Sequence, residues 1–162
     1  MNISPDSGFR LEDFANGSIL LVNKPADWTS FDVVNKIRNT LKHALHIKKI
    51  KVGHSGTLDP MATGLLIICT GKATRLLADF QNLSKEYEGT LMLGACTASY
   101  DAETPVEEEF PVNHITNEAI EAARISFLGD IAQVPPMFSA IKVDGQPLYK
   151  RARKGETIEV KA

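Results

Sequence analysis

The sequence lacks the residue patterns of disulfide-rich, zinc-binding and membrane-spanning proteins. Its only two cysteines, Cys69 and Cys96, lie in no CxxC or Cys/His pattern, which argues against a disulfide framework and a zinc site and predicts two buried, reduced thiols. No apolar run approaches the roughly 20 residues of a membrane helix. Residues 1–8 lack the basic and apolar regions of a secretory signal. These absences predict a folded cytoplasmic protein that does not bind a membrane.

The chain also lacks the overall basic excess that is typical of nucleic-acid-binding proteins, since its formal net charge is −2. The charges are nevertheless separated along the sequence. Between Asp32 and Asp59 there is no acid among several lysines, one arginine and three histidines, whereas Glu86 to Ala123 contains acids and no Lys or Arg. This separation permits a surface with one basic side. Two ordinary solvated faces are the alternative.

With 162 residues, 43% of them hydrophobic, the chain can bury one sizeable core. We expect residues 1–16 to be a flexible leader and 17–162 to form one domain. Apolar periodicity, capping residues and turn residues predict helices over the ranges 29–41, 72–80 and 116–128, and strands over 19–22, 65–69, 86–93, 131–134 and 139–143. The irregular order of these elements, without a repeated βαβ unit, predicts an α+β fold with a mixed, largely antiparallel sheet flanked by helices.

The most informative segment is the glycine-rich stretch 53–64, which reads GHSGTLDPMATG and contains a single carboxylate, Asp59. Pro60 favours an extended backbone at Asp59, and the glycines allow tight turns and the close approach of a ligand. Such a loop can present a carboxylate rigidly. Because Asp-Pro is also a common turn signal, these residues alone leave a catalytic and a purely structural role open.

This stretch resembles the GHxGTLDPxATG motif of the TruB family of tRNA pseudouridine synthases. Further family-like segments follow one another in the expected order and cover the chain from about residue 17 to its end: 17–25, 28–34, 71–74, 85–87, 93–94, 101–103 and 135–155. Several long motifs in one order are far more specific than a single short one. The resemblance implies a pseudouridine synthase fold in which 131–155 is an RNA-contacting insertion.

The resemblance also implies an activity and roles for individual residues. Asp59 is the expected catalytic aspartate, which assists cleavage of the uridine C1′–N1 bond and rejoining at C5, without a cofactor or metal. Tyr87 matches the tyrosine that stacks on the flipped base, and His54 matches a histidine that fills the vacated space. Lys24 matches a motif lysine; support of the catalytic loop is as good an interpretation for it as substrate contact.

The expected partner is the T arm of tRNA, with position 55 in the T loop as the target, and no obligate protein partner is indicated. Basic side chains suited to RNA phosphates come from two parts of the chain: Lys49, Lys51, Lys142, Lys150, Arg151 and Arg153. A solvated hairpin is the other interpretation of the second group.

Two departures from the family pattern stand out. The chain reads Thr97-Ala98-Ser99-Tyr100-Asp101-Ala102 where TDTxDA is common, and it ends before the GTYIRxL-like motif whose arginine pairs with the catalytic aspartate. We therefore expect an incomplete catalytic domain with little turnover of its own. A non-catalytic RNA-binding or RNA-chaperoning module is the alternative. A P-loop is excluded because Leu66 stands where its first glycine is needed.

Overall fold

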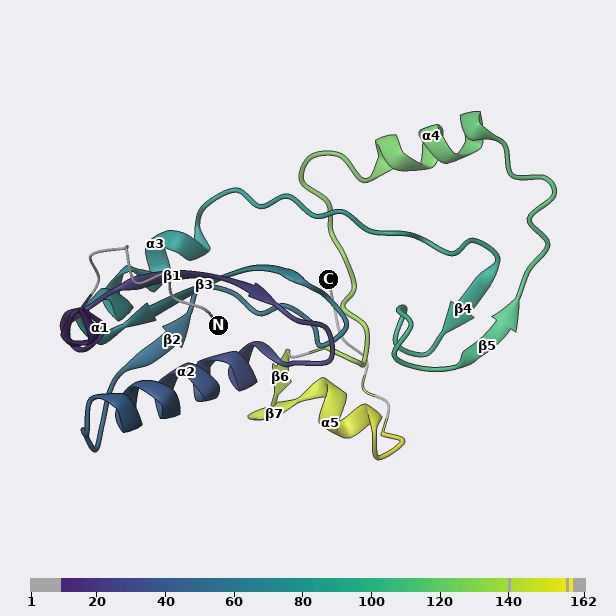
Figure 1. Ribbon diagram of the computed structural model, residues 1–162. Helices are drawn as coiled ribbons and strands as arrows, with labels where there is room; N and C mark the ends of the chain where they lie inside the picture. The colour runs from purple at the N-terminus through teal and green to yellow at the C-terminus, as the bar shows by residue number, and fades with distance from the viewer. Residues whose placement is uncertain (1–9, 140, 157, 159–162) are drawn as a thin grey trace. The chain divides into compact units, whose positions relative to one another are not determined.

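The computed structural model describes residues 10–139, 141–156 and 158, and the chain divides into two compact units, 1–87 and 88–162 (Figure 1). The sequence predicts one domain over 17–162, whereas the structure places a division at Tyr87. The division falls within a stretch that forms neither helix nor strand between Gln81 and Ala95. The predicted strand 86–93 is therefore wrong. Leu91 there is 90% exposed, because no neighbouring strand covers it or pairs with its backbone among the described residues.

The first unit contains a three-stranded antiparallel sheet in the order β1-β3-β2, formed by Ile19–Lys24, Gly64–Thr70 and Val52–His54. The predicted strands 19–22 and 65–69 are confirmed. The sequence did not reveal β2, because three residues with a central glycine carry no alternating pattern. Lys24 pairs with Gly64 at one end of the sheet, and Val52 pairs with Thr70 at the other.

Helix α2, Ser30–Ala44, confirms the predicted helix and its capping residue. Thr29 and Asp32 form a capping box in which the Asp32 N–H donates to Thr29 Oγ1 at 3.0 Å and the Thr29 N–H donates to Asp32 Oδ2 at 2.9 Å. Hydrogen bonds from the Thr29 hydroxyl, and then from its N–H, lower the pKa of the Asp32 carboxyl. These bonds fix the residue at which the helix begins.

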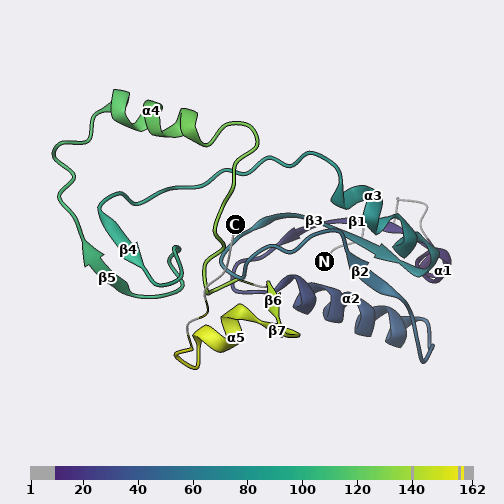
Figure 2. The same cartoon turned by 180° about the vertical axis from the view of Figure 1, so that it is seen from behind.

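The core of the first unit lies between α2 and one face of the sheet, as both views show (Figures 1 and 2). Apolar side chains from the predicted helix face meet inward-pointing side chains of the strands: Val33, Val34, Ile37, Leu41, Val52, Leu66 and Ile68. Strand alternation turns Leu21 and Leu65 to the opposite face, where they are 72% and 63% exposed. One face of this sheet is therefore covered by α2, and the other is open around Leu21 and Leu65.

Helix α1, Leu11–Asn16, lies where the sequence predicts part of a flexible leader. Its Phe14 is buried in the core, and burial of this one aromatic side chain accounts for order in a segment with little periodicity. The other leader residues, 1–9, lie outside the described part of the chain. Gly71, at φ +50°, brings the backbone so close to α1 that a Cβ there would collide with the Ala15 carbonyl.

After β3 the chain forms a 3-10 turn, η2 (Gly71–Leu76), and a short helix, α3 (Leu77–Gln81). Together they confirm the predicted helical segment 72–80. In the second unit, α4 (Asn117–Ser126) begins after its predicted cap Thr116, whose hydroxyl accepts from the Ala119 N–H at 3.2 Å. The strands β4 (Ala95–Thr97) and β5 (Val106–Glu109) form an antiparallel pair that the sequence did not predict.

The predicted hairpin turn at Asp144-Gly145 is confirmed, with φ of 51° and 78°. It joins β6 (Lys142–Val143) to β7 (Gln146–Pro147), and α5 (Leu148–Ala152) follows directly. The predicted strand 131–134 is wrong, because this stretch has no strand partner. Of the predicted strand 139–143, residue 140 lies outside the described residues and only 142–143 form a strand.

The α+β class is confirmed, and every strand pair among the described residues is antiparallel, divided over three small sheets. None of the helices in this part of the chain has the length and apolar character needed to cross a membrane.

The two cysteines differ in exposure, which corrects the expectation that both are buried. Cys69, on β3, is completely buried, and burial raises the pKa of its thiol; Cys96, on β4, is exposed. The thiolate is the reactive form of a cysteine, and a raised pKa and burial both disfavour reaction of Cys69. We therefore expect a thiol-specific reagent to modify Cys96 quickly in the folded chain and both cysteines in urea. Mass spectrometry of the labelled peptides measures this. Fast labelling of Cys69 in the folded chain would contradict the structure.

Candidate active site

The loop that carries Asp59 connects β2 to β3 at the end of the sheet where Lys24 pairs with Gly64. Its first residue continues the sheet, since the Ser55 N–H donates to the Ile67 carbonyl at 3.0 Å. Its last turn closes on Asp59 itself, whose carbonyl accepts from the Ala62 N–H at 3.1 Å. Both ends of the loop are therefore hydrogen-bonded, and the middle requires other support.

Lys24 supplies that support. Its side chain is completely buried, and its ammonium donates to three backbone carbonyls: Pro25 at 2.9 Å, Trp28 at 2.6 Å and Pro60 at 3.1 Å. An ammonium has three protons, so these carbonyls use its full donor capacity. Of the two roles that the sequence leaves open for Lys24, these contacts favour support of the Asp59 loop over substrate contact.

Two further residues, Ser30 at the start of α2 and Asp27 in the turn before it, form hydrogen bonds with the residues on either side of Asp59. The hydroxyl of the buried Ser30 accepts from the Leu58 N–H at 2.9 Å and donates to the Leu58 carbonyl at 3.2 Å. The Asp27 N–H donates to the Pro60 carbonyl at 2.8 Å. Asp27 has φ +64°, a left-handed conformation that Asp tolerates better than most residues. The sequence gave no signal for either contact, because the partners are about thirty residues apart.

Asp59 itself is exposed, although the residues on both sides of it are held. Within the described ranges its carboxylate has no ion-pair partner and no side-chain hydrogen bond, and only its main-chain carbonyl is engaged. A carboxylate that the protein neither buries nor pairs is free to meet a substrate atom. Nor, within those ranges, do three or more His, Cys, Asp or Glu side chains converge as a metal site would need.

His54 lies at the end of β2, close in sequence to the same loop. Its Nδ1 lies 2.6 Å from the Gly56 carbonyl oxygen, and because a carbonyl only accepts, Nδ1 carries the proton in this contact. In the neutral ring Nε2 is then the acceptor. The ring is half-buried, so its free edge is available to a ligand at the start of the loop.

Tyr87 is 74% exposed at the end of the first unit, in the stretch without helix or strand. Among the described residues, Tyr87 forms no side-chain hydrogen bond and no ring contact, and no such contact joins it to the Asp59 loop. Tyr87 is therefore not part of a packed core. Its stacking role stays a prediction.

Lys49 and Lys51 line a hollow of about 500 Å³ at the far end of the sheet from Asp59. The structure adds two cations that the sequence analysis missed, Lys72 and Arg75, both on η2. The Gly71 N–H donates to the Lys51 carbonyl at 2.9 Å, which joins the two segments. Throughout the described part of the chain, none of these four cations forms an ion pair. We call this the basic pocket.

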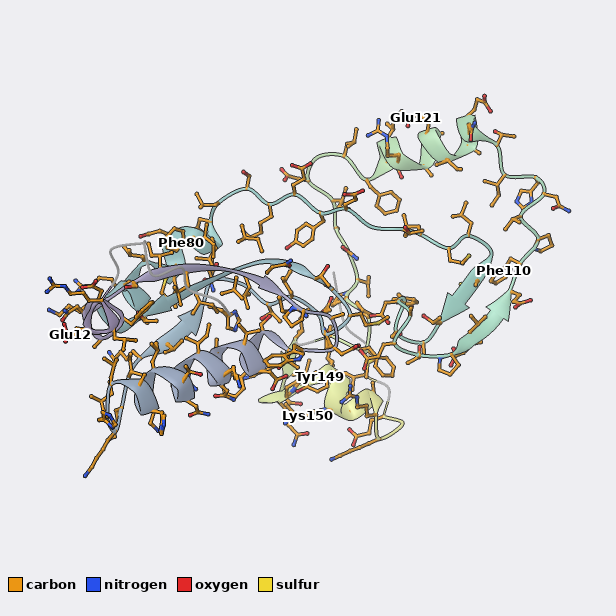
Figure 3. The ribbon with its side chains drawn as sticks, viewed as in Figure 1. Glu12, Phe80, Phe110, Glu121, Tyr149 and Lys150 are labelled. Carbon is orange, nitrogen blue, oxygen red and sulfur yellow. The ribbon has the colours of Figure 1, made fainter. Side chains whose placement is uncertain are left out.

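The four basic residues predicted in the second unit differ in their partners. Lys142 and Lys150 are exposed, and Lys150 follows Tyr149 on α5 (Figure 3). Arg153 instead pairs with Glu103 at 2.7 Å and lies over the Tyr149 ring, 5.5 Å from its centroid. Arg151 donates to the Val143 carbonyl at 3.1 Å. The two lysines are thus free to meet phosphates, and the two arginines are engaged within the unit.

Comparison with known proteins decides the family. The sequence profile of the "TruB family pseudouridylate synthase (N terminal domain)" matches residues 42–162, three quarters of the chain. The chain belongs to the TruB family. The resemblance inferred from the motifs is confirmed, and with it the pseudouridine synthase fold.

Named relatives of this TruB-family chain include tRNA pseudouridine synthase B of Phocaeicola vulgatus, 55% identical over 93% of the chain, and that of Parabacteroides distasonis, 53% identical over 93%. The chain spans 64% of the length of each. A solved structure described as a Cbf5-Nop10-Gar1 complex matches 87% of this chain and 37% of its own, with a TM-score of 0.48 and 26% identity.

Removal of the Lys24 ammonium tests its supporting role. Lys24→Met keeps most of the apolar stem but leaves three carbonyls without their charged donor, so we expect the free energy of unfolding in urea to fall by about 2–4 kcal/mol. Lys36→Met, on the exposed face of α2, is the matched control and should change it by less than about 0.5 kcal/mol. Equal effects of the two substitutions would contradict the role assigned to Lys24.

Proposed function

We propose that the protein containing this chain isomerises uridine to pseudouridine in the T loop of tRNA, at position 55, with Asp59 as its catalytic carboxylate. The observation that carries this proposal is an exposed, unpaired carboxylate on a loop whose neighbouring residues Leu58 and Pro60 are held by hydrogen bonds. Membership of the TruB family and relatives named tRNA pseudouridine synthase B support the reaction and the substrate class. The proposal places the protein in the cytoplasm, together with its tRNA substrate.

The chemistry needs an ionised carboxylate next to the ribose. In one route Asp59 attacks C1′, the C1′–N1 bond breaks with its electron pair on uracil, the base turns, and C5 displaces the carboxylate as the C5 proton leaves and N1 is protonated. In the other route Asp59 removes the C2′ proton while the C1′–N1 bond breaks with its electron pair on uracil, which leaves a glycal. After the base turns, C5 bonds to C1′, the proton returns to C2′, and N1 gains a proton as C5 loses its own. Both routes require the same free carboxylate.

The basic pocket supports RNA as the substrate. Lys51 and Arg75 belong to a group of four cations that have no ion-pair partner in the described part of the chain. Contacts between such cations and phosphates position a nucleic acid without reading its sequence. The pocket and Asp59 lie at opposite ends of β3, a strand of seven residues, which corresponds to about 20 Å. A stem held by its phosphates at the pocket could therefore extend towards Asp59.

The basic pocket also favours a second function, in which the chain binds or remodels RNA without catalysis. The basic pocket does not depend on Asp59, because the two occupy opposite ends of the sheet. An RNA-binding or chaperoning module would keep the pocket and would not need the carboxylate. The two functions are therefore separable by one substitution.

Asp59→Asn is that substitution. We expect it to abolish tritium release from [5-³H]uridine-labelled T-arm RNA, because an amide is neither a base nor a nucleophile, and to leave RNA affinity within about twofold, because phosphate contacts dominate affinity. The assay compares the complete product of the gene, this chain, and the Asp59→Asn form of each. Affinity is measured in parallel by anisotropy of labelled RNA.

Release by the unsubstituted protein and none by the variant supports catalysis by Asp59. Salt-sensitive RNA binding without release from any form would instead favour the non-catalytic module. Release that persists in the Asp59→Asn variant would exclude the proposed role of this carboxylate.

A further inference from the structure

Trp28 is an exposed aromatic residue in the turn that is bonded to the Asp59 loop. Its main-chain carbonyl accepts from the buried Lys24 ammonium at 2.6 Å, and that ammonium also reaches the Pro60 carbonyl at 3.1 Å. Its neighbour Asp27 donates to the same Pro60 carbonyl at 2.8 Å. Hydrogen bonds thus hold the backbone of Trp28 close to the Asp59 loop, while Trp28 as a residue is 38% exposed.

Two more large apolar residues near this loop are exposed. Met61, two residues after Asp59, is 51% exposed. Phe31, next to the loop-bonded Ser30, is 58% exposed, and the Arg38 guanidinium lies over its ring at 5.8 Å from the centroid. We call Trp28, Phe31 and Met61 the apolar rim. Its members come from both segments that the Lys24 and Ser30 contacts join.

A ligand of these three exposed side chains should match them in size and in apolar character. A stable protein interface has about 20–30 residues on each side, which is far more than this rim supplies. A nucleobase fits better: its planar face stacks on an indole, and unpaired bases are bound in this way by many RNA-binding proteins. If Asp59 reaches C1′ of the target nucleotide, the nucleotides covalently bonded to the target must also pass close to this loop.

We propose that the indole of Trp28 stacks on an unpaired base adjacent to the target uridine and so holds the RNA loop open next to Asp59. This inference rests on the proposed function and extends it, because it assigns a binding residue outside the motif of Asp59. The turn is pre-organised for the role: Lys24 fixes the Trp28 carbonyl, and the Thr29–Asp32 capping box fixes the following residues. A rigid aromatic residue loses little conformational entropy when a base binds.

Trp28 is the only tryptophan in the chain, so the intrinsic tryptophan fluorescence of the chain reports on this residue alone. The Asp59→Asn chain is titrated with labelled RNA that copies a T arm, and the anisotropy of the RNA label records binding independently of the tryptophan. We expect tryptophan emission to be quenched along the same titration curve. Fully base-paired RNA of equal length, bound through its phosphates, should leave the emission nearly unchanged.

Substitutions in the same background separate stacking from other effects. Trp28→Phe keeps a stacking ring and should bind within about threefold of the parent, whereas Trp28→Ala should bind about 5- to 150-fold more weakly. Trp28→Leu keeps apolar bulk without a ring and should resemble the alanine variant. Leu11→Ala removes a 49%-exposed apolar side chain from α1, at the other end of the sheet, and should bind like the parent.

The outcomes distinguish this inference from the proposed function. Unchanged Trp28 emission in a complex that anisotropy shows to be formed, or full affinity in Trp28→Leu, would overturn stacking and leave the proposed function intact. Absence of RNA binding by every form would overturn both. Circular dichroism of each variant confirms that the chain remains folded, and the emission experiment in the Asp59→Asn chain does not depend on the folding of any Trp28 variant.

Discussion

The candidate site depends on one buried positive charge. Removing an ammonium from water costs several kcal/mol unless hydrogen bonds replace its hydration, and Lys24 meets this requirement with three backbone carbonyls from two segments. The interaction therefore holds only where the turn after β1 and the Asp59 loop lie together. Ser30 and Asp27 add bonds on the two sides of Asp59, and the carboxylate between them remains exposed.

The first unit separates two kinds of chemistry along its sheet. Among the described residues, an unpaired carboxylate lies at the end where β1 finishes and β3 begins, and four cations without ion-pair partners gather at the other end. The net charge of −2 conceals this arrangement, because the average includes the acidic stretch of the second unit. Separation keeps the lysines of the pocket from pairing with Asp59, so both groups stay available to a ligand.

Sequence patterns predicted the parts of this fold that local physics determines. The capped helix α2 and the strands β1 and β3 have strong periodicity and packed partners, and they were found. Strand 86–93 was predicted from alternation alone and is absent, because alternation does not supply a pairing partner. The motif predicts Asp59 and His54 as candidate site residues, and these roles stay predictions. Lys72 and Arg75 are pocket residues that only the folded structure reveals, because the Val52–Thr70 pairing brings their segment beside Lys51. The Ser30–Leu58 bond likewise joins residues that no local pattern connects.

Amide hydrogen exchange of the Asp59 loop tests most directly whether Lys24 holds it. In the unsubstituted chain the amides of Asp27 and Leu58 donate hydrogen bonds to Pro60 and Ser30, and they should be protected. In Lys24→Met both should exchange much faster, because local opening no longer breaks the charged contacts, while the amides inside α2 keep their protection. Equal protection of Asp27 and Leu58 in both proteins would contradict the central role of the buried ammonium.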